Sequence, residues 1–352
     1  MHHTSMGIRY ALAGTRVLIT GGTGTFGRRM LRELLRMPEG PDSIVVLSRD
    51  EMKQARIWEQ HEHDPRLRMF IGDVRDRARL EHAFRGVDVV IHAAAMKQVP
   101  AAEYNPTEAV ATNVTGAINV VDAAISAGVR RVVALSTDKA CEPINLYGAT
   151  KACAEKIFLA ASSLVGALGE PKFAVTRYGN VAASRGSVLE VWKDALQQPE
   201  DAPGRVVIKV TDPACTRFWM TPAEAVRMVL WTIEHMEGGE TVVPDLPAYR
   251  VHDLAVAASA VYATTEPGLV AYHTTGMRAG EKLHEAMISR HEVNQYQARH
   301  GADEETRYWV RDPHNPPANV RQTPLESDTA RPMSVLELQD RIKNLEGMGE
   351  YA

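Results

Sequence analysis

The sequence predicts an α/β protein, with a Rossmann-type doubly wound parallel sheet and a smaller, interleaved carboxyl-terminal substrate lobe. Three observations support this. Short apolar segments alternate with helical ones through the first half of the 352-residue chain, as a parallel sheet with helical crossovers requires. A glycine-rich turn follows the first apolar segment. A Tyr-x-x-x-Lys pair, Tyr147 and Lys151, opens a later helix.

The first strand, Val17–Ile19, leads through the glycine-rich turn into a helical run from Arg28 to Arg36. The turn has the spacing G-x-x-G-x-x-G, which lets a backbone approach a pyrophosphate at a helix amino terminus. An ordinary strand-to-helix turn is the alternative, and the strand before and the helix after favour the dinucleotide site. The residues expected to hold the cofactor are Gly21, Thr23, Gly24, Thr25, Phe26 and Gly27.

The end of the second strand, Ile44–Ser48, is expected to select the cofactor. No carboxylate ends this strand; Ser48 and Arg49 stand there, with Lys53 one helical turn beyond. Cations at this point suit a 2′-phosphate, so the sequence favours NADP over NAD, although Asp50 lies between them. A solvated helix start is the alternative.

The third and fourth strands end in residues that suit the rest of the cofactor. Asp73 and Val74 follow the strand Met69–Gly72, and Asp73 is either a partner for the adenine amino group or a cap for the next helix. After the strand Val87–His92, the small side chains of Ala93, Ala94 and Ala95 let the backbone pass close to ribose and pyrophosphate, unless they pack a helix onto the sheet.

A long helix is expected from Pro106 to Gly128, and Asn113 is a polar residue within its small, apolar stretch. We expect the Asn113 amide to satisfy backbone groups near the active site and to adjoin the cofactor. A plain surface position is the alternative.

The fifth strand, Val132–Ser136, places Thr137, Asp138 and Lys139 at its carboxyl end, where open α/β sheets bind ligands. Tyr147 and Lys151 lie four apart on one face of the next helix. There the ammonium would lower the pKa of the phenol towards neutrality, which makes the tyrosine a general base for a hydroxyl. For Asp138 and Lys139, a solvent-exposed ion pair is the alternative.

Beyond the sixth strand, Lys172–Tyr178, the alternation breaks after Asn180 and loops with arginines begin. We therefore expect a cofactor-binding domain over residues 15–180, completed by part of 216–245. The substrate lobe would take residues 181–215 and 246–330, and a carboxyl-terminal helix 331–352. The polar, proline-rich segment from His300 to Pro324 is expected to be irregular. Taken singly, Arg185, Arg217 and Arg278 are more typical of surface cations than of one anion site.

Composition favours a cytoplasmic enzyme. Lys plus Arg is 40 and Asp plus Glu is 44, a net charge of −4, so no basic field points to nucleic acid or to an anionic membrane. The three cysteines lack metal-ligand spacing and fit a reducing compartment. No metal site is expected. Nor did we identify an apolar stretch long enough to span a membrane, or the apolar core of a signal peptide.

The motifs together resemble the extended short-chain dehydrogenases/reductases, and among them the soluble inverting UDP-N-acetylglucosamine 4,6-dehydratases that begin pseudaminic acid synthesis. The string Ser136–Ala140 with Pro143–Lys151 is the most specific, whereas the glycine motif is shared by the superfamily. The matching stretches are Thr20–Gly27, Ser48–Gln54, Gly72–Asp76, His92–Pro106, Leu135–Lys151, Arg177–Val188, Thr211–Trp219 and Arg278–Glu285.

The resemblance implies a cycle of C4 oxidation, C5/C6 water elimination and C6 reduction, with NADP as cofactor, UDP-N-acetylglucosamine as substrate and a homo-oligomeric state. Tyr147 would take the O4 proton, Thr137 would bond O4, and Lys151 would also bind the nicotinamide ribose. Lys139, as the free amine, would remove the C5 proton, while Asp138 protonates the departing C6 hydroxyl. The residues implied for the UDP-sugar are Lys97, Asn180, Arg185, Ser187, Arg217, Arg278 and Glu281.

Three alternatives remain open at this point. In the resemblance, Asp-Glu after Thr137 is typical of retaining dehydratases, and small or hydroxyl residues there are typical of 4-epimerases; Asp138-Lys139 favours elimination with inversion. A non-catalytic NADP-sensing protein would lack the tyrosine or lysine, and both are present. Cys141-Glu142 and the segment from Val293 to Pro324 depart from the family pattern.

Overall fold

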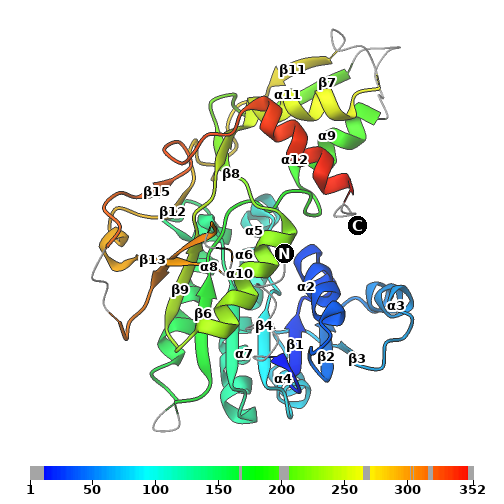
Figure 1. The fold of residues 1–352 in the computed structure, drawn as a ribbon, viewed down its shortest axis with the longest axis vertical. Coiled ribbons are helices and arrows are strands. Elements are labelled where there is room, and N and C mark those ends of the chain that lie inside the picture. Colours follow the sequence, from blue (N-terminus) through cyan, green and yellow to red (C-terminus); the bar gives the residue numbers. More distant parts are fainter. Residues whose placement is uncertain are drawn as a thin grey trace.

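A nine-stranded sheet, in the order β13-β14-β9-β6-β5-β4-β1-β2-β3, forms the framework of the molecule (Figure 1). The computed structural model describes residues 12–165, 169–197, 206–264, 270–301, 303, 305–315 and 320–347. The order β3-β2-β1-β4-β5-β6 is that of a Rossmann sheet, so the predicted fold class is confirmed. The parallel strands are β1 (Arg16–Thr20), β2 (Ser43–Ser48), β3 (Leu67–Ile71), β4 (Val89–His92), β5 (Arg131–Leu135), β6 (Lys172–Thr176) and β9 (Glu240–Pro244).

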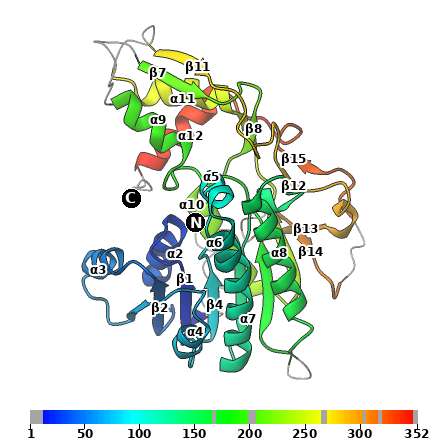
Figure 2. The same ribbon diagram turned by 180° about the vertical axis from the view of Figure 1, so that it is seen from behind.

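Helices cover both faces of this sheet, which is why its central strands are apolar on both sides. In β1, Val17 and Ile19 belong to one core cluster and Leu18 to the other. α2 (Thr25–Arg36) and α10 (Pro222–His235) cover the first face, seen in front in Figure 1. α4 (Arg77–Ala83), α7 (Gly116–Ala127) and α8 (Leu146–Ala161) cover the second, seen in front in Figure 2, and α3 (Glu51–Gln60) packs beside β2 and β3.

The long helix expected from Pro106 to Gly128 is present, but a π-helical turn interrupts it. α5 (Val99–Tyr104) precedes α6 (Pro106–Val110), the π turn covers Ala111–Thr115, and α7 ends at Gly128, whose positive φ of 67° closes the helix. The run Pro106–Ala127 is long and apolar enough, by length and composition, to cross a membrane. Our expectation that no such stretch exists was therefore wrong, although 56% of its most apolar window is buried in the protein, as in a core helix.

The smaller lobe has a hydrophobic core of its own, which includes Leu189, Trp192, Leu254 and Ile342. β7 (Val206–Val210) pairs in parallel with β11 (Val270–Thr274), and the helices packed beside them are α9 (Val188–Gln197), α11 (Val251–Tyr262) and α12 (Val335–Gly347). Two small antiparallel pairs join the lobe to the sheet domain: β8 (Thr216–Phe218) with β10 (Ala248–Arg250), and β12 (Ala286–Ile288) with β15 (Leu325–Glu326).

The segment after residue 293 corrects two expectations. A short 3-10 turn, Val293–Gln295, precedes β13 (Gln297–His300), and β14 (Arg307–Arg311) pairs antiparallel with both β13 and β9. The stretch from His300 to Pro324 is therefore not wholly irregular, and β13 and β14 extend the main sheet rather than the substrate lobe. In β14, Tyr308 and Val310 are buried against the first core, which explains why the strand pairs there.

Candidate active site

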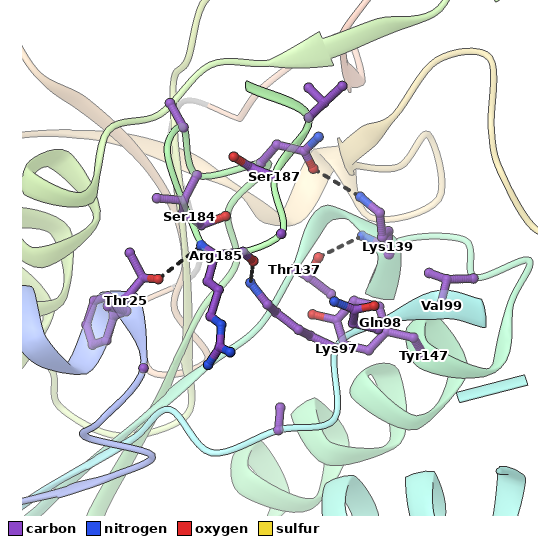
Figure 3. A pocket seen from close by; sticks show the side chains of 18 of the residues that line it. Thr25, Lys97, Gln98, Val99, Thr137, Lys139, Tyr147, Ser184, Arg185 and Ser187 are labelled. Atoms are coloured by element: carbon purple, nitrogen blue, oxygen red, sulfur yellow. Dashed lines mark hydrogen bonds between the residues drawn. The ribbon is translucent and has the colours of Figure 1, made fainter. Parts of the chain in front are cut away.

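A cavity of about 1600 Å³ lies at the carboxyl ends of the central strands, between the sheet domain and the smaller lobe. Its wall contains almost every residue that the sequence assigned to the site. The exceptions are Asp138 and Asn113, both buried behind the wall. Figure 3 shows Thr137, Lys139 and Tyr147 on one side of the cavity, with Thr25 and Arg185 opposite them.

The glycine-rich turn is shaped for close contact with a ligand. A Cβ at Gly21, where φ is +67°, would lie 2.9 Å from Cα of Ala94, and a Cβ at Gly27 would lie 2.4 Å from Cα of Gly22. Gly24 caps α2 without a side-chain hydrogen bond, so the first amides of this twelve-residue helix face the cavity without a capping side chain. Amides in this position bind phosphate oxygens, and the turn therefore fits a dinucleotide pyrophosphate.

Charged side chains line the cavity where β2 ends. The Arg49 guanidinium is 69% exposed and lies 3.8 Å from the Asp73 carboxylate, whereas the Lys53 ammonium is 2.6 Å from Asp50, which caps α3. Asp73 accepts hydrogen bonds from Arg75, and Asp76 rather than Asp73 caps α4. The Asp73 carboxylate also accepts from the Arg75 N–H at 3.0 Å, so it caps the turn before α4 although Asp76 caps the helix itself. Arg49 is the cation freer to meet a ligand.

Asn113 positions other residues rather than lining the cavity. Its amide accepts a hydrogen bond from the Met96 N–H at 2.8 Å, and donates to the Met96 carbonyl and to the Thr150 hydroxyl, each at 3.0 Å. The expectation that it satisfies backbone groups is confirmed, and direct contact with a cofactor is not supported. The hydroxyl of Thr150 in turn donates to the Tyr147 carbonyl, so Asn113 braces the first turn of α8.

Gly148 permits α8 to approach the turn that carries Lys139. A Cβ at position 148 would lie 2.1 Å from the Lys139 carbonyl oxygen, a distance no side chain tolerates. Asn145 caps the helix by accepting from the Gly148 N–H at 2.8 Å. The sequence Tyr147-Gly148 therefore puts the phenol beside the Asp138–Ala140 turn.

The electrostatics of Tyr147 differ from our expectation. Burial raises the pKa of Tyr147, and the cation that opposes this effect is Lys139, with help from the Thr137 hydroxyl. The Lys151 ammonium is turned to the Leu135 carbonyl, at 2.6 Å. Burial lowers the pKa of Lys151 to about 8, against the opposing charge of Glu155. Without ligands, Tyr147 is thus a neutral phenol.

Lys139 is held as an ammonium by acceptors from three segments. Its Nζ lies 3.1 Å from Asp138 Oδ1, 3.2 Å from Asn180 Oδ1 and 3.4 Å from Glu285 Oε1. Burial lowers the pKa of Lys139, but the charges of Asp138 and Glu285 outweigh burial, and the pKa stays above its usual value. The resemblance implied a free amine at Lys139. In the structure, the proton of Lys139 must move before this residue can act as a base.

The predicted sugar-nucleotide residues converge on the lobe side of the cavity. Arg217, which is 7% exposed, donates to Glu281 Oε1 at 3.1 Å, and the Arg278 Nε lies 3.3 Å from Glu281 Oε2. On the other wall, the Arg185 N–H donates to the Thr25 hydroxyl and its carbonyl accepts from Lys97 Nζ, while its guanidinium extends into the cavity (Figure 3). These contacts join the loop around Arg185 to the glycine-rich turn and to Lys97.

A buried ion network supports the catalytic segment from behind. Arg177 forms a bidentate ion pair with Glu155, through hydrogen bonds of 3.0 and 2.7 Å. It also donates to Glu292 and to the Met287 carbonyl, at 2.6 and 2.8 Å. Ser136 donates to Glu155 as well. Arg177 therefore anchors residues 287–292, which follow Glu285, to the sheet domain.

Glu285 and Tyr249 are polar residues of the cavity wall that the sequence analysis did not assign to the site. The stretch Arg278–Glu285 resembles the family, and this was the signal in the sequence that could have identified Glu285. Tyr249 lies opposite Arg217 in the β8–β10 pair, a tertiary relationship that no local pattern encodes. Among the residues that the structure describes, no cluster of His, Cys, Asp or Glu could hold a metal ion.

Comparison with known proteins identifies the family. Residues 17–303 match the family model described as "Polysaccharide biosynthesis protein". The chain belongs to this family. Within it, an inverting UDP-N-acetylglucosamine 4,6-dehydratase of Campylobacter jejuni is 48% identical over 273 residues, or 78% of this chain and 77% of the relative. A UDP-glucose 4-epimerase of Rickettsia felis is 40% identical over 279 residues, 79% of this chain and 78% of the relative.

Solved structures agree with the family assignment. Pen from Bacillus thuringiensis superposes with a TM-score of 0.85 at 32% identity, covering 95% of this chain and 98% of that one. DesIV of Streptomyces venezuelae, a dTDP-glucose 4,6-dehydratase solved with NAD, gives a TM-score of 0.65 at 25% identity, covering 76% and 86%. The likeness to DesIV covers the smaller share of the chain.

Proposed function

We propose that the protein is a UDP-N-acetylglucosamine 4,6-dehydratase that inverts C5, giving a UDP-2-acetamido-2,6-dideoxy-L-arabino-hexos-4-ulose. The observation that carries this proposal is the contact between Asp138, Lys139 and Glu285 beside Tyr147. A phenol alone serves oxidation at C4, whereas loss of water across C5 and C6 also needs a base for the C5 proton and an acid for the C6 hydroxyl, roles that an amine and a carboxyl can fill. The Campylobacter relative carries the same activity in its name.

A nicotinamide dinucleotide fits the groove between the glycine-rich turn and Arg49. When bound, it would accept hydride from C4 and return it to C6. The residues that would hold it are those of the turn, with Ser48, Arg49, Lys53, Asp73 and Val74 at the adenosine end and Ala93–Ala95 beside the pyrophosphate. We infer that it is NADP, because the exposed Arg49 suits a 2′-phosphate. NAD, which DesIV binds, is the alternative.

The catalytic side chains are assigned by the atoms they can reach. Once Tyr147 has lost its own proton, the phenolate takes the proton of O4, with the Thr137 hydroxyl near the same oxygen. Lys139 is the cation that acts on the phenol in the structure, and the resemblance adds Lys151. The resulting 4-ketone acidifies C5. Lys139 then removes the C5 proton once its own proton has moved, and a buried carboxyl, Asp138 in the resemblance, protonates the departing C6 hydroxyl. Reprotonation of C5 on the opposite face gives inversion.

The diphosphate and sugar occupy the lobe side of the cavity. Arg217 and Arg278 are positioned by the shared carboxylate of Glu281, and a guanidinium held in this way meets a phosphate without first losing side-chain freedom. Asn180 and Ser187 complete this wall, with Lys97 and Arg185 opposite.

Incubation of the purified protein with UDP-N-acetylglucosamine and NADP⁺ tests the function. The product should lose the mass of one water molecule, and its NMR spectrum should show a 6-deoxy sugar inverted at C5. Unchanged mass with inversion at C4 would instead support a 4-epimerase, the activity in the name of the Rickettsia relative. A 6-deoxy product not inverted at C5 would identify a retaining dehydratase. Binding of NADP without turnover would indicate a sensing protein.

Three further inferences belong to this proposal. The product would enter pseudaminic acid synthesis, the enzyme would act as a homo-oligomer, and it would work in the cytoplasm. The last is supported by Cys141, Cys153 and Cys215, all of which are free thiols.

A further inference from the structure

Glu285 is a buried carboxylate in the wall of the active site. The residue is 2% exposed. Its Oε1 lies 3.4 Å from Lys139 Nζ and 3.9 Å from Arg217 Nε. Its Oε2 has no hydrogen-bond partner. A buried carboxylate oxygen without a donor is costly, so this atom is suited to carry a proton or to meet a ligand hydroxyl.

The second carboxylate at this position, Asp138, is placed differently. Its Oδ1 already accepts from the Thr137 hydroxyl at 2.8 Å as well as from Lys139. Its Oδ2 is buried and unpartnered, but Asp138 does not reach the cavity wall, whereas Glu285 does. Of the two carboxylates beside the Lys139 ammonium, Glu285 is therefore the one that lines the cavity.

The backbone around Glu285 holds its carboxylate in place. The Glu285 N–H donates to the Ser327 hydroxyl at 2.9 Å, and its carbonyl accepts from the Ser327 N–H at 2.8 Å. Two residues later, the Met287 carbonyl accepts from the buried Arg177. Glu285 is thus fixed to the sheet domain across the junction with the lobe.

We propose that Glu285 accepts the proton of the Lys139 ammonium and then delivers it to the departing C6 hydroxyl of the sugar. This inference rests on the proposed dehydratase function. It also replaces Asp138 as the acid in that step and leaves Asp138 as the partner that positions Lys139.

The proton balance closes in two steps. First, the Lys139 N–H bond breaks and an O–H bond forms on Glu285, which leaves an amine and a carboxylic acid. Second, the amine takes the C5 proton, the electrons of the C5–H bond form the C5=C6 bond, and the C6–O bond breaks. The oxygen takes the proton of Glu285 and leaves as water. Lys139 ends as ammonium and Glu285 as carboxylate, as they began.

The charges around Glu285 make it a better proton acceptor than an ordinary carboxyl, while the charges of Asp138 and Glu285 hold the proton on Lys139. Burial and the neighbouring Asp138 carboxylate raise the pKa of Glu285, while Lys139, Arg217 and Lys282 oppose that rise. A carboxyl whose pKa is raised in this way takes a proton more readily than an exposed carboxyl does.

Glu285→Gln tests the inference, because glutamine keeps the shape and the acceptor for Lys139 but takes no proton. We expect kcat for the dehydrated product to fall by about a hundredfold or more. Incorporation of solvent deuterium at C5 should fall with it, while the formation of NADPH on mixing with substrate, and the Kd for UDP, stay near wild type. Asp328→Asn, at an exposed position nearby, is the control and should match wild type in every measurement.

The outcomes separate this inference from the proposed function. Wild-type protein that releases no water from UDP-N-acetylglucosamine contradicts the proposed function itself. A wild type that dehydrates the substrate, beside a Glu285→Gln protein with kcat and a pH profile within about twofold of it, overturns the role of Glu285. If Glu285→Gln does not fold, Glu285→Asp decides. For Glu285→Asp we expect slower dehydration and a shifted pH dependence of kcat, with UDP binding intact. An unchanged pH dependence of kcat overturns the role of Glu285.

Discussion

Arg217 donates to Glu281 in the wall of the cavity at 3.1 Å, and the second oxygen of the same carboxylate lies 3.3 Å from Arg278. The burial of Arg217, with 7% of its side chain exposed, contrasts with the 67% exposure of Arg278. One carboxylate therefore joins a fixed guanidinium to an accessible one, and both are expected to face the diphosphate.

Arg278→Ala is expected to weaken substrate binding more than the chemical step. Hydrogen bonds to charged groups contribute about 1.5–3 kcal/mol, so KM should rise by about tenfold to a hundredfold with a smaller fall in kcat. Steady-state kinetics and UDP titration measure both, and Arg290→Ala, at an exposed position outside the cavity wall, is the control. A collapse of kcat at unchanged UDP affinity would show that Arg278 serves the chemistry instead.

Arg49→Ala should weaken the binding of NADP much more than that of NAD, because only NADP carries a 2′-phosphate. Lys53→Ala should have the smaller effect, since Lys53 is already paired with Asp50 at 2.6 Å. Titration of each variant with both cofactors measures the difference. Equal weakening of NADP and NAD by Arg49→Ala would remove the basis for assigning NADP.

The sequence predicted the sheet, and all but two of the residues it assigned to the site line the cavity, because those assignments depend on local patterns. Alternating apolar segments, the glycine spacing and the Tyr-x-x-x-Lys pair all act within short stretches of chain. Glu285 and Tyr249 were missed because they reach the site through pairings between distant segments. The same reason applies to β14, whose polar, proline-rich neighbourhood hid a strand that pairs with β9.

Protonation states were the least predictable part of the site. Spacing placed Lys151 beside Tyr147, yet the Lys151 ammonium bonds the Leu135 carbonyl, and Lys139 is the cation that acts on the phenol. The pKa of Lys139 depends on its burial, on the adjacent Asp138 and also on Glu285, which lies far away in sequence. A pKa reflects all neighbouring charges and burial, so spacing along one helix was insufficient.

The pH dependence of kcat/KM should show an alkaline limb set by Lys151. The pKa of this buried ammonium is lowered to about 8, so its charge is present below that pH and is lost as the pH rises through it. Loss of this charge removes the cation that the resemblance assigns to the phenolate and to the nicotinamide ribose, and activity should fall. A profile that stays flat to 10.5, the ordinary lysine value, would show that Lys151 is not the limiting group.

Gly148→Ala is expected to destabilise the protein and impair catalysis together. Alanine normally favours a helix interior over glycine, but here its Cβ would lie 2.1 Å from the Lys139 carbonyl oxygen. Overpacking of this kind costs about 1–3 kcal/mol, and relief of the clash must move α8 away from Lys139. Thermal melting and turnover should both drop. A variant with wild-type melting temperature and kcat would show that this close approach is unnecessary.

Lys139→Ala, studied with UDP-N-acetylglucosamine in deuterated water, tests the central claim most directly. If Lys139 is the C5 base, the variant should form NADPH on mixing, because Tyr147 and Lys151 remain, but release no water and exchange no proton at C5. Tyr147→Phe should stop even the formation of NADPH, and Lys156→Ala, at an exposed position on α8, should behave as wild type. A Lys139→Ala protein that makes the 5-inverted, 4-keto-6-deoxy product at near wild-type rate would contradict the mechanism and reopen the retaining and epimerase alternatives.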